Sequence, residues 1–359
     1  MAKLSMALFC ALITTPTLSL AGGFSEHGSN NNPTIGTSSR PDDHAPISVM
    51  GDHMHRAGEF MISVRHMRME MSGNKNGTRT LDDNSVLAIA NTNGGMFTNL
   101  RAVPQKMTMT MTMLGAMYAP SNEVTLMLGT SYRANKMTAR SYNMMGNLNG
   151  AFTTKSEGFG DTTLSALIKI TDTLHTGIGV SLPTGSIKKS DVILTPMNTR
   201  LKARLPYAMQ LGSGTYDLKP SLTYNNKSDK MSFGFQIGGI FRLEDNRQAY
   251  TRGDEQYAKF WGARPLSQNI SLSGLISASH ADSISGKDAA INTPIQSAQA
   301  SFYGGDRVQL SIGVNWIGSK GLLSGHRLGL EISQPIYENL NGPQMSLETQ
   351  IMIGYQNAF

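Results

Sequence analysis

The most constraining feature of the sequence is the alternation of apolar and polar residues at its C-terminal end, residues 345–359. Every second side chain counted back from Phe359, through Tyr355 and Ile351, is mostly apolar or aromatic, and the side chains between them are mostly polar or small. This period of two predicts a β-strand, because successive side chains of a strand point to opposite faces of a sheet. Such a strand could belong to a barrel in a lipid bilayer or to a soluble sandwich.

Residues 1–21 predict that the chain is exported. Lys3 precedes a mostly apolar run from Leu4 to Leu20, and small residues end the run at Ala21. This order is typical of a secretory signal peptide. The one cysteine, Cys10, lies in that peptide, so the mature chain has no disulfide to stabilise it. We therefore expect a large core or a closed sheet to hold the fold together.

The composition argues against membrane-spanning helices. Hydrophobic residues make up 39% of the chain and the mean hydropathy is −0.23. After the signal peptide, no apolar run approaches the roughly 18 residues that a spanning helix needs. The strands of a membrane barrel escape such a search, because their polar lumen side offsets their lipid side. The formal net charge of +6 is modest, and no basic run is interleaved with aromatic residues, so nucleic acid is not an expected partner.

The rest of the chain favours the barrel over the sandwich. Residues 22–57 are polar and rich in Gly, Ser, Asn and Pro, which predicts a flexible periplasmic lead or a lumen plug. Alternating segments recur over residues 58–359, and their connections are alternately long and short. This asymmetry is typical of outer-membrane barrels, whereas a sandwich gives no reason for it. The sequence therefore predicts an all-β, transmembrane antiparallel β-barrel of about 12 strands.

The predicted barrel places the protein in the bacterial outer membrane. We expect its last strand to pair with its first, at residues 58–71, and so to close the ring. The expected partners are outer-membrane lipid and the barrel assembly machinery, which would act through the C-terminal strand.

Charged residues on the predicted inner faces are candidates for a solute path. Such charges could form a selectivity ring, or they could form a salt-bridge network that fills the lumen. The sequence does not decide between the two. The candidate residues are Arg65, Arg133, Lys169, Asp217, Lys219, Arg242, Arg327, Glu331 and Glu348.

Methionine is the most unusual residue type, with 23 copies that concentrate around the first three predicted strands. Thioethers are soft, neutral ligands that suit Cu(I), which makes copper binding or transport an alternative function. Methionine is also a common filler of irregular apolar space, and no fixed ligand spacing is present, so packing is the more economical interpretation. Residues 107–117 do not show which face of their strand meets the lumen. The candidate metal ligands are His53, Met54, His55, Met67, Met69, Met109 and Met111.

Catalytic chemistry has one weak candidate. Ser279, His280 and Asp282 are close in sequence, but His280 and Asp282 share the side of Ile276 and Ala278, which we expect to face lipid. The cluster does not match the His and Ser motif of the twelve-stranded outer-membrane phospholipases. We therefore expect no enzyme activity, and a lipid hydrolase or a purely structural barrel remains a further alternative.

Several segments together resemble a known group of proteins. They are residues 158–161 (Gly-Phe-Gly-Asp), 177–185, 211–217, and the Met-rich stretches 49–55 and 107–118. These are similar to segments of outer-membrane proteins of the phenol-degradation MetA-pathway type, which are regarded as transporters. The terminal strand also resembles the C-terminal signal strand of outer-membrane barrels. The resemblance implies a channel for a small solute, apolar or aromatic, with no catalytic residues to transfer.

Overall fold

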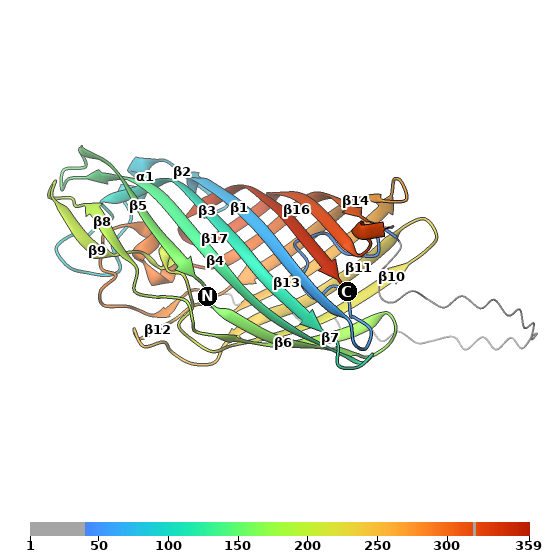
Figure 1. Ribbon diagram of the computed structural model, residues 1–359. Coiled ribbons are helices and arrows are strands. Elements are labelled where there is room, and N and C mark those ends of the chain that lie inside the picture. The colour runs from blue at the N-terminus through green and yellow to red at the C-terminus, as the bar shows by residue number, and fades with distance from the viewer. Residues whose placement is uncertain (1–39, 319–320) are drawn as a thin grey trace, which may run out of the picture. The chain divides into compact units, whose positions relative to one another are not determined.

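Long strands with one apolar and one polar face form the wall of a closed antiparallel β-barrel (Figure 1). The computed structural model describes residues 40–318 and 321–359. The predicted signal peptide and residues 22–39 lie outside this described part. The eleven elements of the ring are β1 (Phe60–Gly77), β3 (Ala102–Tyr118), β4 (Val124–Tyr142), β6 (Thr162–Lys169), β7 (Leu174–Leu182), β10 (Asp217–Lys227), β11 (Ser232–Arg242), β13 (Glu255–Pro265), β14 (Ile270–Ala281), β16 (Gly305–Ile317) and β17 (His326–Ala358).

β17 crosses the wall twice. Its first part pairs with β16, from Arg327 opposite Ile317 to Leu340 opposite Gly305. Its second part pairs with β1, and the backbone N–H of Ala358 donates to the carbonyl of Gly325 at 3.3 Å. The element must therefore double back after Leu340. Within the described residues the ring of eleven elements thus contains twelve antiparallel segments, and the predicted transmembrane antiparallel barrel is confirmed.

The ring closes between the first strand and the last. β1 and β17 pair from Met61 opposite Ala358 to Gly77 opposite Leu340. At the end of this seam, Phe60 and Phe359 exchange two backbone hydrogen bonds of 2.9 and 2.8 Å, and their rings lie 5.2 Å apart. No edge strand is left in the ring, so its backbone polar groups are paired within the wall.

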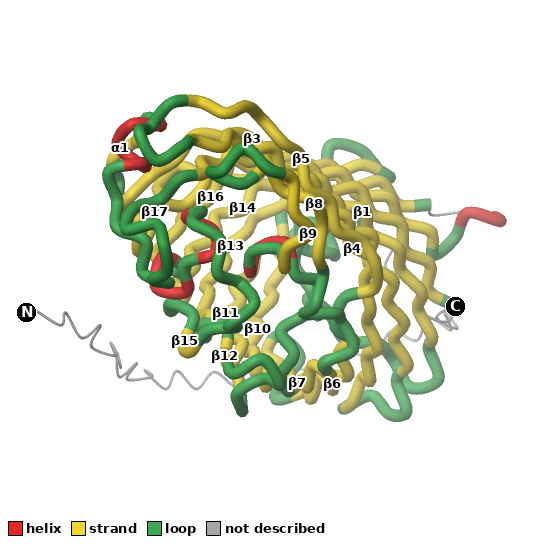
Figure 2. The backbone as a smooth tube through the Cα atoms, turned by 90° about the vertical axis from the view of Figure 1, so that its left-hand side faces the viewer, coloured by secondary structure: helices red, strands yellow, loops and turns green. Residues whose placement is uncertain are grey.

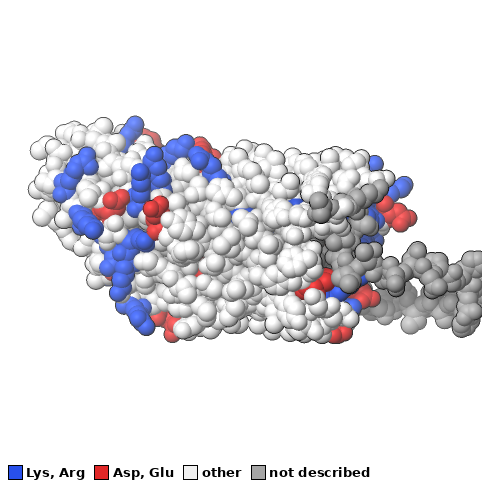
Figure 3. All heavy atoms as spheres, viewed as in Figure 1, with Lys and Arg blue, Asp and Glu red and all other residues white. Residues whose placement is uncertain are grey.

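The outer surface of the barrel is apolar. Ile62, Leu164, Ile312 and Ile332 are among many aliphatic side chains that are more than 40% exposed on it. On the face seen in Figure 3, charged side chains gather toward the two ends of the barrel and leave an uncharged band between them. Apolar side chains on the outside and polar side chains on the inside are typical of a barrel that lies in a lipid bilayer.

The longer connections carry extra structure beyond one end of the ring. β5 (Leu148–Phe159) pairs with the end of β4, and the two form a β-hairpin. Figure 2 looks toward this end of the barrel, where several short elements gather. They are β2 (Arg79–Leu81), α1 (Asp83–Leu87), β8 (Ser190–Leu194), β9 (Arg200–Arg204), β12 (Tyr250–Thr251) and β15 (Ser285–Gly286).

The short turns lie at the opposite end, which by the usual rule for such barrels is the periplasmic end. Among the described residues, no helix has the length and apolar character needed to cross a bilayer.

One local register differs from the prediction. Glu70 pairs with Thr349 but Met71 pairs with Leu347, so Glu348 is an extra residue in β17. This bulge reverses which side chains face inward beyond it. Leu347 is therefore buried inside the barrel, although the alternation counted from Phe359 places it outside.

Candidate functional site in the barrel lumen

Residues 40–58, called the plug from here on, enter the lumen at the periplasmic end. The Ser48 hydroxyl donates to Glu331 at 2.7 Å, and the amide of Gln236 donates to the carbonyl of Met50 at 2.9 Å. The His175 ring lies 2.9 Å from the carbonyl of Gly51. These three partners come from β17, β11 and β7, so the plug is held by strands on several sides of the ring.

Ile47 anchors the plug in an apolar socket. Its side chain is 2% exposed and clusters with Met67 of β1 and Met352 of β17. Two glycines of β17 make room for it, because a Cβ added at Gly354 would lie 2.5 Å from Ile47, and one added at Gly329 would lie 3.0 Å from it. Any larger side chain at Gly354 would therefore compete with Ile47 for the same space.

Three of the predicted lumen charges contact the plug. Arg327 donates to the carbonyl of Ala45 at 2.6 Å, and Arg65 lies 2.9 Å from the sulfur of Met50. Glu331 accepts from the backbone and hydroxyl of Ser48. All three charged side chains are buried. They serve to hold the plug, which the sequence did not indicate.

Four other predicted charges lie in the lumen farther from its periplasmic end. Asp217 and Arg242 form an ion pair that is almost completely buried, and Arg242 also contacts Glu255 at 3.0 Å. Lys219 donates to the hydroxyl of Thr163 at 2.9 Å. Arg133 lies on the same inner face, on β4, and lines the central cavity with Lys219.

Two of the predicted lumen charges lie elsewhere. The alternation along β6 directs Lys169 inward, but this residue lies at the periplasmic mouth of the barrel. There it pairs with Asp172 at 2.6 Å. Glu348 is exposed and bonds to the Ser72 hydroxyl near the outer rim. The bulge in β17 explains why Glu348 does not face the lumen, because simple alternation counted from the C-terminus takes no account of an inserted residue.

Methionines line one wall of the lumen. In the register of β1 and β3, Met67 lies opposite Met111, Met69 opposite Met109, and Met71 opposite Met107. Met352 extends the first of these rows on β17. Directly opposite residues of an antiparallel pair point to the same face. Since Met67 and Met107 are buried inside the barrel, the structure assigns the ambiguous 107–117 face to the lumen.

A cavity of about 310 Å³ lies beside this wall. Met111 and Met113 line it, and so do Lys219 and Arg133, which is directly opposite Met111 in the register of β3 and β4. The plug borders it through residues 50–53. The cavity therefore has an apolar, polarizable side and a cationic side.

Loop residues close over the lumen at the outer end. Tyr207, Met209 and Ile295 belong to one buried cluster with the inward-facing Met107 and Met137 of the wall. The rings of Tyr207 and Tyr250 are 4.9 Å apart within this cluster. The plug and this loop cluster thus occupy the two ends of the lumen.

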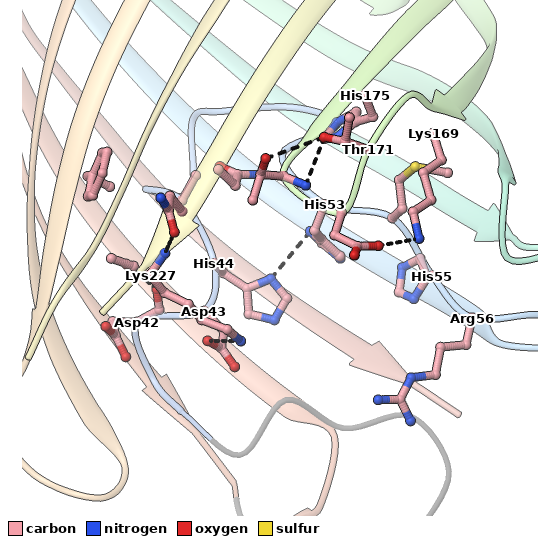
Figure 4. Close-up of a pocket in the computed structure, with 18 of the residues that line it drawn as sticks. Asp42, Asp43, His44, His53, His55, Arg56, Lys169, Thr171, His175 and Lys227 are labelled. Carbon is pink, nitrogen blue, oxygen red and sulfur yellow. Dashed lines mark hydrogen bonds and ion pairs between the residues drawn. The ribbon is translucent and has the colours of Figure 1, made fainter. Parts of the chain in front are cut away.

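Histidines and an aspartate gather on the plug, beside a cavity of about 780 Å³ at the periplasmic mouth (Figure 4). The Nδ1 atoms of His44 and His53 are 3.3 Å apart. Asp52 lies 2.9 Å from His53 and 3.8 Å from His44. His55 contacts Glu59 at 3.1 Å through its own Nδ1.

These groups have altered protonation. Burial, helped by the Arg327 guanidinium, lowers the pKa of His44 to about 3. Burial and the neighbouring His53 lower the pKa of His55 to about 4. Burial alone would raise the pKa of Asp52, but His53 and His44 hold that pKa well below its usual range. At neutral pH both of these imidazoles are therefore uncharged while the carboxylate is ionised.

The predicted metal ligands lie in several separate places in the structure. His53 bonds to Asp52 of the plug and His55 bonds to Glu59, which directly follows the plug. Met54 packs with the methionines near the periplasmic end. Met67, Met69 and Met111 pack around Ile47, and Met109 belongs to the outer cluster. The seven residues do not converge on one site.

The Ser279–Asp282 cluster lies at the outer end of β14. His280 is 2.7 Å from Asp306 and 3.5 Å from Asp282, and its side chain is half exposed. The ring therefore pairs with two carboxylates on the surface of the barrel.

The sequence did not indicate Ile47, the glycines of its socket, His44 or Asp52. The one available signal was that His44 lies in the same polar segment as His53 and His55. The plug has no regular period, so nothing local indicated which of its side chains meet.

Comparisons with known proteins agree with the architecture. No family model and no curated protein matches the chain. Among solved structures, an outer membrane channel from Pseudomonas putida F1 is similar with a TM-score of 0.57 and 13% identity, over 87% of this chain and 100% of that one.

Two further structures are similar at lower scores. The toluene transporter TodX of P. putida has a TM-score of 0.43 and 11% identity, over 84% of this chain and 90% of that one. A FadL homologue of Pseudomonas aeruginosa has a TM-score of 0.44 and 8% identity, over 90% of this chain and 98% of that one. Of these three, the first has a TM-score high enough to show a shared barrel fold, and at such identities only the fold is shared.

Proposed function

We propose that this protein is a channel of the bacterial outer membrane that passes small apolar solutes, including aromatic ones. The cavity bounded by Met111 and Met113 carries the proposal. Methionine side chains are flexible and polarizable, and their sulfurs make favourable contacts with aromatic rings. A volume of about 310 Å³ lies at the small end of the range for ligand pockets, which suits one small ring compound.

The closed ends of the lumen favour a selective path over an open pore. The plug fills the periplasmic side and the loop cluster fills the outer side. A solute must displace or bypass both, so passage depends on binding in the cavity between them. The cationic side formed by Arg133 and Lys219 would orient a polar substituent such as a hydroxyl group.

Two further observations support the proposal. The fold is shared with an outer membrane channel. Channels of the outer membrane are usually β-barrels of this kind. The resemblance of residues 158–161, 177–185 and 211–217 to the phenol-degradation transporter type fits an aromatic solute.

Flux into liposomes tests the proposal. Purified protein in liposomes should admit an aromatic alcohol faster than a sugar of similar size. Changing Met111 and Met113 to Gln adds polar groups at similar volume, and should lower the aromatic flux several-fold. Met145→Gln is the matched control, because Met145 is 88% exposed outside the barrel. Equal aromatic flux in the cavity variant and the control would refute a role for this wall.

A structural barrel with a permanently blocked lumen is the competing class. Removing residues 43–53 deletes the wall contacts of Ile47, Ser48 and Met50, while the β1–β17 seam stays intact. If the lumen is a path, this deletion raises flux. If neither protein passes any solute, the structural class is correct.

The copper alternative is favoured by one observation, the pairing of Met67 with Met111 and of Met69 with Met109 across β1 and β3. Thioethers from neighbouring strands could share a Cu(I) ion. Against this, Ile47 packs among three of these residues, and neutral sulfur leaves the charge of the ion uncompensated.

Competition against a Cu(I) chelator tests this alternative, with the four methionines changed to Leu. Loss of copper in that variant would support it. Equal copper in both proteins, or none in either, would leave the methionines as an apolar wall.

A further inference from the structure

The plug contains a second cluster of potential ligands, made of nitrogen and oxygen donors instead of thioethers. His44, Asp52 and His53 each offer one atom, and these atoms all lie within 4.8 Å of one another. All three residues belong to the plug, at the two ends of a short loop that reaches into the lumen. Asp52 and His53 also line the cavity proposed for the solute.

The spacing of the two nitrogens fits a tetrahedral ion. Zinc binds imidazole nitrogen at about 2.0–2.1 Å, so two nitrogens on one tetrahedral ion are about 3.3 Å apart. The Nδ1 atoms of His44 and His53 are 3.3 Å apart. One carboxylate oxygen of Asp52 lies 2.9 Å from the Nδ1 atom of His53, and the other lies 3.8 Å from the Nδ1 atom of His44.

Hydrogen bonding alone leaves this cluster incompletely satisfied. Two ring nitrogens that face each other at this distance can share only one proton between them, because two N–H groups would repel. The Nε2 atom of His55 is buried and has no hydrogen-bond partner among the described residues. Buried polar atoms without a partner are uncommon and call for an explanation, such as an ion.

His55 adds to the ligand set. Its side chain is 5% exposed, and its Nδ1 contacts the carboxylate of Glu59. This is the arrangement by which a carboxylate orients a metal-binding histidine and leaves the other nitrogen basic. The ring of His55 is 4.9 Å from that of His53, so His55 lies beside the cluster.

We propose that His44, Asp52 and His53 form a binding site for a divalent transition metal of the zinc type, with His55 as the additional ligand. The donors are imidazole and carboxylate, which suit such ions better than Ca²⁺ or Mg²⁺. The cavity at the periplasmic mouth gives solvent access to His44, His53 and His55.

A bound ion would join the two ends of the loop from His44 to His53. This loop carries Ile47, Ser48 and Met50, which contact the wall. The metal would therefore fix the conformation in which the plug fills the lumen. The nearby Arg327 opposes a cation, so we expect binding in the micromolar range rather than tighter.

Metal binding to the full-length protein in detergent tests the site. Zinc is titrated by competition with a chromophoric chelator, and cobalt is added separately because its visible spectrum reports tetrahedral coordination. Wild type should bind one ion per chain. His44→Gln and His53→Gln should each weaken binding about tenfold or more, with loss of the cobalt bands.

Two further variants complete the experiment. Asp52→Asn keeps an oxygen to accept from the backbone of Ala45 but removes the charge, and should also weaken binding. His280→Gln is the control, because His280 forms a His–carboxylate cluster on the surface, and its loss should change nothing. The proposal is overturned if wild type binds no ion, or if the His44 and His53 variants bind as wild type does. Heat-modifiable migration checks that each variant is folded.

Discussion

At the scale of single residues, space as well as charge determines where the plug lies. Gly354 and Gly329 leave a depression in the wall that Ile47 fills. The hydrogen bonds from Arg327 and to Glu331 then fix the adjacent backbone. Because the interior is close-packed, a side chain at Gly354 would remove the depression entirely.

We predict that Gly354→Leu displaces the plug and raises ion conductance in planar bilayers several-fold. Leucine fits the extended backbone of β17, so the barrel should still assemble. Gly274→Leu is the matched control, because a Cβ at Gly274 meets nothing within 4 Å. Conductance of the Gly354 variant at the wild-type level would show that Ile47 does not hold the plug in place.

At the scale of elements, the short helix α1 depends on one carboxylate. Asp83 accepts hydrogen bonds from Tyr142, Gln105 and Arg140. Burial by itself would raise the pKa of Asp83, but these three partners lower it overall. A helix of five residues has little stability of its own, so these contacts tie it to β3 and β4.

The sign of the pH effect follows from this lowered pKa. A carboxyl with a depressed pKa stabilises the folded form above its unfolded pKa, and the effect is lost as pH falls through the folded pKa. We predict that amide protection of residues 83–88 is full at neutral pH and decreases in acid below the usual aspartate range. Asp83→Asn should lower protection at neutral pH, whereas Asp245→Asn, in another loop, should not. A pH-independent protection factor would contradict this account.

The seam between β1 and β17 is the second element that can be tested. Phe359 contributes two backbone hydrogen bonds and a ring contact with Phe60 at the end of the seam. Changing Tyr355 and Phe359 to Asp, or deleting Phe359, should block assembly, because an open barrel leaves unpaired backbone groups.

Heat-modifiable migration in outer-membrane fractions measures this assembly. Leu148→Asp, at an exposed position outside the ring, is the control that should assemble normally. Normal migration of the Phe359 variants would show that the terminal residues are dispensable.

At the scale of the whole molecule, the apolar outer belt places the barrel in the bilayer. Ile332 is 47% exposed and pairs with Ile312 near the middle of the wall. We predict that Ile332→Arg lowers the free energy of unfolding in lipid by about 2–4 kcal/mol, the usual effect of a charge at the midplane. Leu201→Arg, on β9 outside the ring, should change it by less than about 1 kcal/mol. Reversible unfolding in denaturant measures both, and equal effects would argue that Ile332 does not face lipid.

The sequence by itself determined the strands and most of their faces. Side-chain alternation is a local property, so Arg65, Arg242, Arg327 and Glu331 could be assigned to the lumen without knowing their neighbours. The same alternation identified the apolar belt, and the alternately long and short connections predicted the closed ring of antiparallel strands.

Only the tertiary structure decided what depends on partners from other strands. The methionines of residues 107–117 alternate with threonine, and pairing with β1 assigned them to the lumen. Glu348 does not face the lumen, because it is the extra residue of a bulge and alternation alone cannot reveal a bulge. His44 meets His53 and Asp52 because the plug folds back against the wall, and an irregular segment has no period that encodes such a contact.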